Sequence, residues 1–172
     1  MSASLYFIGT LHAGITSNNE LGLLIEEISP DQILVEIAQE DLEKNNLDGY
    51  PPEMIFAYDF AKNNNILVNG FDLKINVLKA GVTEEDSQRL ILLQKKIVGD
   101  RSWKDFNRSE DEKELNKVDN ITDWNKWRNR EIELGKNIRK IILKGKKVLV
   151  ITGCGHLDFF EQLFEKATFP LR

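Results

Sequence analysis

Two histidines stand in similar surroundings near the two ends of the chain. The sequence of 172 residues contains only His12 and His156, in GTLH and GCGH, and each follows a glycine by three positions after an apolar run. Imidazole is the commonest metal ligand, and its pKa also suits proton transfer near neutral pH. The spacing indicates either a shared chemical site or two glycine turns whose histidines cap helices or pack.

A carboxylate interrupts a third apolar segment. Glu36 stands inside LVEI, where an unpaired carboxylate is costly to bury and needs a cation, a metal or a donor network beside it. Two histidines and one glutamate are also the ligand set of catalytic zinc sites that keep one position open for water. We therefore predict His12, Glu36 and His156 as metal ligands, with a solvated or arginine-paired Glu36 as the alternative.

Three further polar residues are candidates for the same site. Asp72 directly follows NGF, although an aspartate there is often only a helix cap. Glu131 occupies a position in a helical stripe where the pattern asks for an apolar residue, and Arg130 precedes it. The planar fork of Arg130 suits a substrate carboxylate or carbonyl, whereas a simple ion pair is the alternative for Glu131.

The elements that must position these residues alternate between strands and helices. Four runs rich in Ile, Leu and Val predict strands, and their continuity is typical of a sheet covered on both faces. They span 5–9, 32–37, 66–71 and 147–152. Helical patterns over 18–28 and 52–62 lie between them, so we predict a single α/β domain over 1–172 with a mainly parallel sheet. Ligands bind such sheets at the carboxyl ends of the strands, where both histidines fall.

The segment between the third and fourth strands is long and polar. A helix is predicted from about 83, followed over 100–119 by an exposed polar excursion that is helical in part. The longest helix then runs from 122 or 123 to about 145, with an apolar stripe that includes Trp124, Trp127 and Leu134. We expect the excursion to be a solvated face, with a lid or a partner surface as the alternative.

Composition and motifs exclude several classes of function. A net charge of −5 argues against a general nucleic-acid binder, and the apolar runs are shorter than a membrane span. The first ten residues lack the pattern of a signal peptide, so we expect a cytoplasmic protein. GCGHLD lacks the third glycine of a dinucleotide-binding fingerprint, and Cys154 between two glycines is more typical of a small packed residue than of a nucleophile.

Taken in order, these motifs resemble the TraB/PrgY/Tiki superfamily, whose wider relatives include erythromycin esterases and haem-binding ChaN-like proteins. GTLH matches the family's Gly-Thr-x-His, PDQILVEI its strand that ends in Glu, and GFD its third strand ending in Asp. REIELGKNI, from Arg130 to Ile138, resembles the family's helix motif, and GCGH resembles its closing Gly-x-x-His. The resemblance covers nearly the whole chain, and it implies an erythromycin esterase/ChaN-like α/β fold.

The resemblance implies a metal-dependent hydrolase that acts on a small peptide or ester. His12, Glu36 and His156 would hold Mn²⁺, Co²⁺ or Zn²⁺, whose bound water would attack the substrate. Glu131 or Asp72 would accept the proton, and Arg130 would steady the oxyanion. In an alternative mechanism without a metal ion, His12 or His156 acts directly as the general base.

The second hypothesis is a binding or regulatory module that sequesters a peptide, a metal or haem in the same crevice. Two arginines that are usual in the family are absent here, which favours this alternative. Leu73 stands in the place of one, and the stretch that would carry the other offers only Lys44. The sequence leaves the substrate, the metal and the oligomeric state open.

Overall fold

The computed structural model describes residues 3–172, which form an α/β fold around one sheet. The strands are β1 (Ser4–Thr10), β2 (Gln32–Val35), β3 (Leu67–Gly70) and β4 (Lys147–Gly153). The α-helices are α1 (Asn18–Ile28), α2 (Gln39–Lys44), α3 (Pro52–Asn63), α4 (Glu84–Val98), α5 (Ser109–Asn116), α6 (Trp124–Ile141) and α7 (Leu157–Leu163). Two short 3-10 helices are η1 (Trp103–Asn107) and η2 (Cys154–His156).

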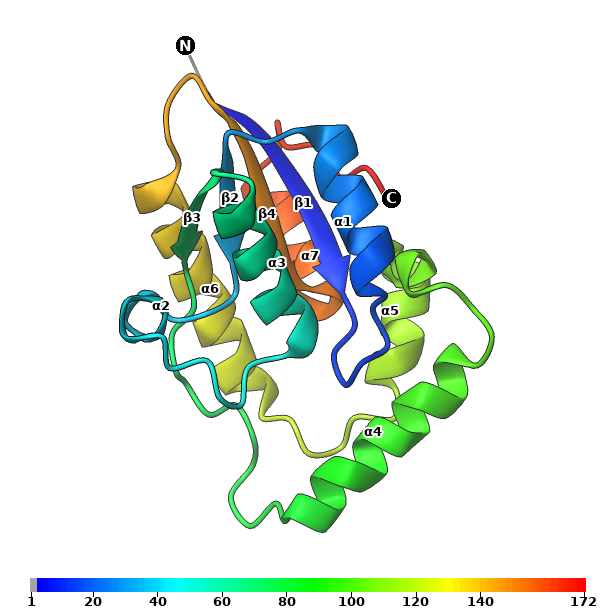
Figure 1. Cartoon of the computed structure of the whole chain (residues 1–172). Coiled ribbons are helices and arrows are strands. Elements are labelled where there is room, and N and C mark those ends of the chain that lie inside the picture. The colour runs from blue at the N-terminus through cyan, green and yellow to red at the C-terminus, as the bar shows by residue number, and fades with distance from the viewer. Residues whose placement is uncertain (1–2) are drawn as a thin grey trace.

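The sheet is parallel throughout, with the strand order β1-β4-β2-β3. The last strand in the sequence therefore lies between the first and the second, and β1 pairs with β4 from Ser4 with Lys147 to Thr10 with Gly153. This confirms the predicted parallel sheet and makes neighbours of the two strands that precede the histidines. All four strands end on the same side of the molecule (Figure 1).

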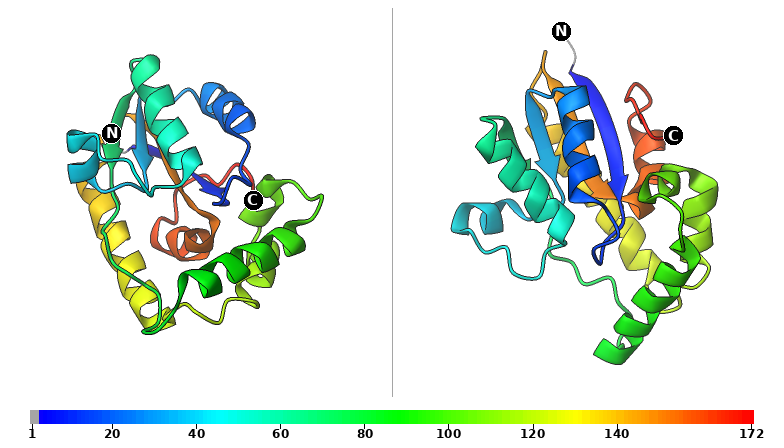
Figure 2. Two further views of the ribbon diagram at one scale, coloured as in Figure 1. Left: turned by 60° about the horizontal axis from the view of Figure 1, so that its bottom comes forward. Right: turned by 45° about the vertical axis from the view of Figure 1, so that its right-hand side comes forward.

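Helices cover both faces of the sheet, as the continuous apolar strands predict. Along β4, Val148 and Val150 pack toward α6 and α7, whereas Leu149 and Ile151 belong to the cluster formed with α1 and α3. Two views show α1 and α3 on one side of the sheet and α6 and α7 on the other (Figure 2). The site-bearing strand ends are thus held between two apolar layers.

Polar side chains begin the helices near the predicted places. Ser17 caps α1 by accepting a hydrogen bond from the Glu20 amide, and Thr83 forms a capping box at α4. Asp123 caps α6 by accepting from two amides of its first turn. These bonds satisfy amides that the helix itself leaves without partners. Strand β2 ends at Val35, whereas the predicted strand spanned 32–37. Glu36 therefore lies just after the strand and not within it.

The predicted exposed excursion over 100–119 is wrong in its central part. Trp103 and Phe106 of η1 and Leu115 of α5 are buried in the core. The buried Asn107 donates to the Gly9 carbonyl over 2.9 Å and accepts from the Gly9 amide over 2.8 Å. This side chain thereby completes the hydrogen bonding at the outer edge of β1, so the segment protects an edge strand.

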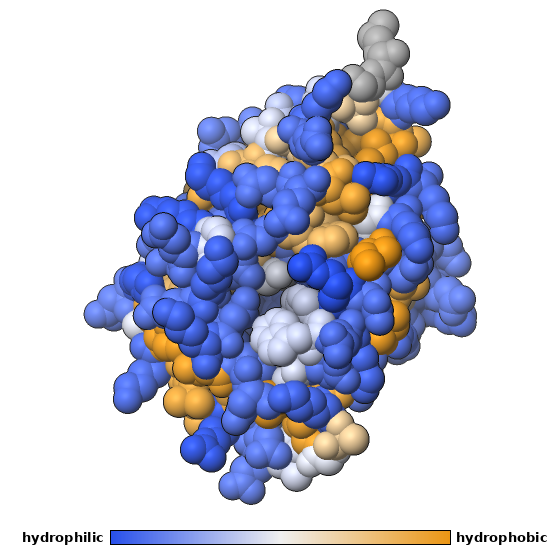
Figure 3. Space-filling view, turned by 180° about the vertical axis from the view of Figure 1, so that it is seen from behind, coloured by the Kyte–Doolittle hydropathy of each residue, from blue (hydrophilic) through white to orange (hydrophobic). Residues whose placement is uncertain are grey.

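The surface outside these layers is mainly hydrophilic when seen from behind, with separate apolar patches and a hollow near the centre (Figure 3). None of the helices in residues 3–172 is long and apolar enough to cross a membrane. Helix α4 extends beyond the carboxyl ends of the strands, beside α5 (Figures 1 and 2).

Candidate functional site

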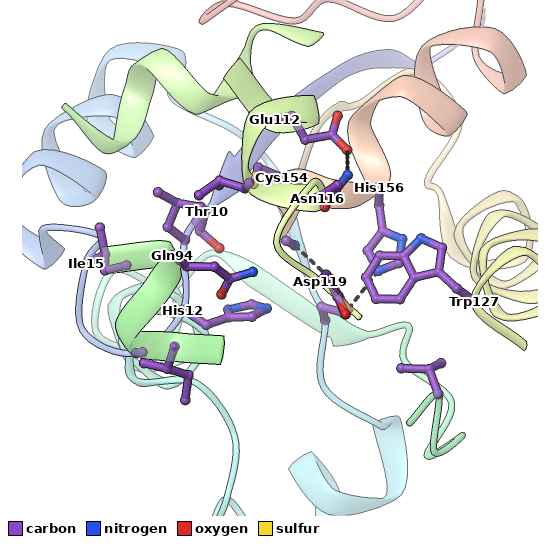
Figure 4. A pocket seen from close by; sticks show the side chains of 18 of the residues that line it. Thr10, His12, Ile15, Gln94, Glu112, Asn116, Asp119, Trp127, Cys154 and His156 are labelled. Atoms are coloured by element: carbon purple, nitrogen blue, oxygen red, sulfur yellow. Dashed lines mark hydrogen bonds and ion pairs between the residues drawn. The ribbon is translucent and has the colours of Figure 1, made fainter. Parts of the chain in front are cut away.

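The carboxyl ends of the strands meet at a cavity of about 550 Å³. Each strand brings one predicted site residue to this edge: His12 after β1, Glu36 after β2, Asp72 after β3 and His156 after β4. Arg130 and Glu131 reach the same region from α6. His12 and His156 both line the cavity (Figure 4), so the predicted convergence of the two histidine motifs is present in the structure.

Arg130 is the centre of the polar cluster at this edge. Its Nη2 donates to Glu36 Oε1 over 2.9 Å and to Asp72 Oδ1 over 2.6 Å, and its Nη1 lies 2.9 Å from His156 Nε2. The residue is only 9% exposed. The arginine-paired alternative for Glu36 is therefore the arrangement found, and the guanidinium joins three of the predicted site residues.

The imidazole of His156 contacts Trp127, Arg130 and Glu131. Its ring stacks on the indole of Trp127, with centroids 4.3 Å apart and planes 10° apart. An arginine only donates, so Arg130 Nη1 faces an unprotonated Nε2, and the Nδ1 proton points to Glu131 Oε1 at 3.3 Å. When protonated, Nε2 has Glu36 Oε1 at 3.4 Å as its acceptor. The ring thus has partners in both charge states.

Burial and neighbouring charges both shift the pKa values of the cluster. Burial alone would raise the pKa of Glu36, but His156 and Arg130 hold it well below its usual range. Burial and the negative charge of Glu36 raise the pKa of Asp72 to about 6, against the opposing charge of Arg130. Burial lowers the pKa of His156, yet the charge of Glu36 and the bond to Glu131 raise it overall. Asp72, whose pKa is about 6, is therefore the group of the cluster suited to exchange protons near neutral pH, whereas the surroundings of His156 favour its charged form.

The other histidine forms a separate pair. His12 Nδ1 lies 2.6 Å from Glu53 Oε1, in the first turn of α3; the His12 side chain is 48% exposed and that of Glu53 is 1% exposed. Within residues 3–172, His12 Nε2 has no hydrogen-bond partner. A Cβ on Gly153 would lie 3.2 Å from this Nε2 and 3.8 Å from Glu36 Oε2, so the glycine lets the ring approach the polar cluster.

The predicted metal ligands do not form a metal site in this arrangement. Arg130 occupies the space between Glu36, Asp72 and His156, and its own positive charge satisfies the two carboxylates. Glu36 Oε2 is also taken, since it accepts from the Thr152 hydroxyl and from the Gly153 amide. In the described part of the chain, no three His, Cys, Asp or Glu side chains are grouped to hold a metal ion. Metal binding by these residues stays a prediction of the sequence.

Two residues of the site, Glu53 and Trp127, were not among those predicted. Glu53 is an ordinary acidic residue in a helix first turn by sequence, and only the fold places it beneath His12. Trp127 was assigned to an apolar stripe, but it covers His156, and its Nε1 donates to Glu131 over 3.1 Å. Glu131 itself is buried beside His156, which its interruption of the stripe indicated.

Cys154 fits its expected role as a small packed residue. It is the first residue of η2 and is buried in the core cluster, and burial raises the pKa of its thiol. A thiol of raised pKa is a poor nucleophile, because the reactive form is the thiolate.

Comparison with known proteins shows no matching family model, no matching curated protein and no matching solved structure. The resemblance to the TraB/PrgY/Tiki superfamily therefore stays a prediction that rests on the ordered motifs.

Proposed function

We propose that this protein hydrolyses small esters or amides with His12 as the general base. The observation that carries the proposal is the short bond between the half-exposed His12 and the buried Glu53 at the cavity. Within residues 3–172, Thr10 is the only other group that bonds Glu53 Oε1, and Glu53 Oε2 has no partner. The buried carboxylate thus holds the imidazole by its Nδ1, which fixes the orientation of the ring as in a base-and-orienter pair.

In the proposed reaction, water attacks the substrate carbonyl carbon while His12 Nε2 takes one of its protons. Glu53 keeps the ring in the tautomer with the proton on Nδ1 and stabilises the imidazolium that forms. An Arg130 N–H that is not bonded to Glu36 or Asp72 donates to the oxygen that becomes negative, while these two carboxylates fix the guanidinium and balance its charge. Collapse of the tetrahedral intermediate breaks the bond to the alcohol or amine, which leaves with the proton from His12.

The first test is hydrolysis of p-nitrophenyl butyrate and of short peptide p-nitroanilides by the wild type and two variants. His12→Ala is expected to lower kcat/KM by about 100-fold or more, the usual contribution of a general base. Glu53→Gln is expected to cause a large loss in kcat, because a glutamine N–H can face Nδ1 and favour the wrong tautomer. Asp59→Asn, an exposed carboxylate on the same helix, is the matched control. Full activity in His12→Ala would refute the proposal.

The same preparation tests the alternatives. Under the proposal, a chelator leaves activity unchanged, whereas activity that is lost on chelation and restored by Mn²⁺, Co²⁺ or Zn²⁺ would favour a metal-dependent hydrolase. A peptide or haem that raises the melting temperature in proportion to its concentration, with no turnover of any ester or peptide, would favour the binding module.

A further inference from the structure

Large apolar side chains that the fold leaves exposed gather at the cavity. Ile75 is 42% exposed, Ile91 37% and Trp124 44%, and all three line it. They come from separate parts of the chain: the segment after β3, the middle of α4 and the start of α6. Single exposed apolar residues are common on protein surfaces, but several around one hollow indicate a surface that an apolar group covers.

The apolar part of the cavity continues inward from these residues. Val77, Val98 and Leu115 line it further, again from the segment after β3, from α4 and from α5. The groups proposed to carry out the reaction, by contrast, come from the ends of the strands and from Arg130 on α6, while Gln94 and Asn116 add polar groups to the wall formed by α4 and α5. The cavity therefore joins an apolar wall to the polar groups that would carry out the reaction.

The charges of the cavity disfavour an anionic ligand. Among its lining residues, Arg130 is the only lysine or arginine, and its guanidinium is already bound to Glu36 and Asp72. A further carboxylate, Asp119, lines the cavity, and so does Glu112, whose pKa burial raises to about 7. An incoming carboxylate or phosphate would meet the negative charges of Glu36 and Asp119 without a free cation to pair with.

We propose that the substrates are uncharged esters with an apolar acyl chain, which lies against Ile75, Ile91 and Trp124 while the carbonyl faces the polar groups. The inference deepens the proposed function and rests on it. The cavity of about 550 Å³ falls within the range of roughly 300–1,000 Å³ of small-molecule sites. The product carboxylate would be repelled by the acidic lining, which favours its release.

The kinetic test compares p-nitrophenyl acetate, butyrate and octanoate. The wild type is expected to have a higher kcat/KM for the longer chains. Ile91→Gln is expected to reduce the preference for octanoate over acetate by about tenfold, since a few methylene groups in an apolar pocket give discrimination of this order. Leu92→Gln is the matched control, because the neighbouring Leu92 is 67% exposed and does not line the cavity. Its chain-length preference is expected to equal that of the wild type.

A binding test separates this inference from the proposed chemistry. The neutral ketones 2-butanone and 2-octanone are titrated by calorimetry into the wild type, His12→Ala, Ile91→Gln and Leu92→Gln. We expect 2-octanone to bind more tightly than 2-butanone except in Ile91→Gln. If this holds but no ester is hydrolysed, the proposed function fails and the apolar site stands. Ester hydrolysis without any chain-length preference in either test would overturn the apolar site, as would equal effects of Ile91→Gln and Leu92→Gln.

Discussion

Arg130 determines whether the buried carboxylates of the site are tolerated. Replacing it by glutamine leaves Glu36 and Asp72 without their cation, and breaking a buried ion pair typically costs about 3–5 kcal/mol. We expect the free energy of unfolding to fall by about 3 kcal/mol at pH 7, near the lower end of this range. The loss is limited because Asp72, whose pKa is about 6, can take up a proton when the arginine is absent. Urea unfolding at pH 7 and at pH 5 measures this, and the loss should shrink at pH 5.

Lys136→Gln is the control for this prediction. Lys136 lies on the same helix, and its ion pair with Glu133 at 2.6 Å joins two exposed side chains. An exposed pair contributes about 1 kcal/mol or less, so this variant should remain close to the wild type. Equal losses in the two variants would contradict the central role of Arg130.

Which site residues could be predicted depends on whether the local sequence carries a conflict. Glu36 and Glu131 interrupt apolar patterns, and a carboxylate in such a place needs a partner, so both could be identified without the fold. Glu53 gives no such signal, because acidic residues are ordinary in the first turn of a helix. Its role depends on a contact with His12, 41 positions away, and only the tertiary structure brings the two together.

At the scale of elements, η1 is expected to stabilise the sheet through one side chain. Asn107→Ala would remove both hydrogen bonds to Gly9 and leave a buried amide and carbonyl without partners. Each unsatisfied buried group costs about 1–3 kcal/mol, so we expect a loss of about 2–4 kcal/mol in the free energy of unfolding. Chemical denaturation measures it, with the exposed Asn64→Ala as control. A loss under about 1 kcal/mol, the level of one ordinary hydrogen bond, would contradict the role assigned to Asn107.

Helix α4 is expected to be the least protected long helix. Of its residues only Val98 is buried, and glycines with positive φ, Gly81 at 84° and Gly99 at 54°, stand near its two ends. Helix α6 instead buries five residues against the sheet and the site. Amide hydrogen exchange followed by mass spectrometry should therefore be faster over 84–94 than over 130–138. Equal protection of the two segments would show that contacts other than the burial of Val98 stabilise α4.

The elements themselves were predictable to different degrees. The four strands could be predicted because strands covered on both faces are continuously apolar. Helices α2 and α7 are too short to show a clear period, and they were not predicted. The segment 100–119 was misjudged because its buried residues are few and widely spaced among charges. Their burial against β1 depends on contacts nearly 100 residues apart in sequence, such as Asn107 with Gly9.

For the whole molecule, the strand order explains why a site can be divided between the chain ends. Strand β4 is last in the sequence but pairs with both β1 and β2, so Gly153 lies beside the residues that follow those strands. The apolar patterns predict that the strands are parallel, but they do not specify their order. The matching Gly-x-x-His motifs were the only local indication that β1 and β4 are neighbours.

The stability of the whole chain should depend on pH through Glu112. This residue is 4% exposed, its Oε2 has no partner in residues 3–172, and burial and the charge of Asp158 raise its pKa to about 7. Asn116, Arg172 and His156 oppose the rise. Because the folded chain holds this proton more tightly than the unfolded one, the stabilisation is complete below about pH 4.5 and is lost as the pH rises through 7.

Glu112→Gln keeps the shape of the side chain and its acceptor for Asn116 but cannot ionise. Relative to this variant, the wild type should therefore lose free energy of unfolding between pH 5 and pH 8, and the two urea midpoints should separate in that range. Other titrating groups are common to both proteins, so taking the difference isolates the contribution of Glu112. Glu110→Gln, exposed on the same helix, serves as the control and should follow the wild type throughout. A constant difference between Glu112→Gln and the wild type across this range would show that Glu112 does not titrate there.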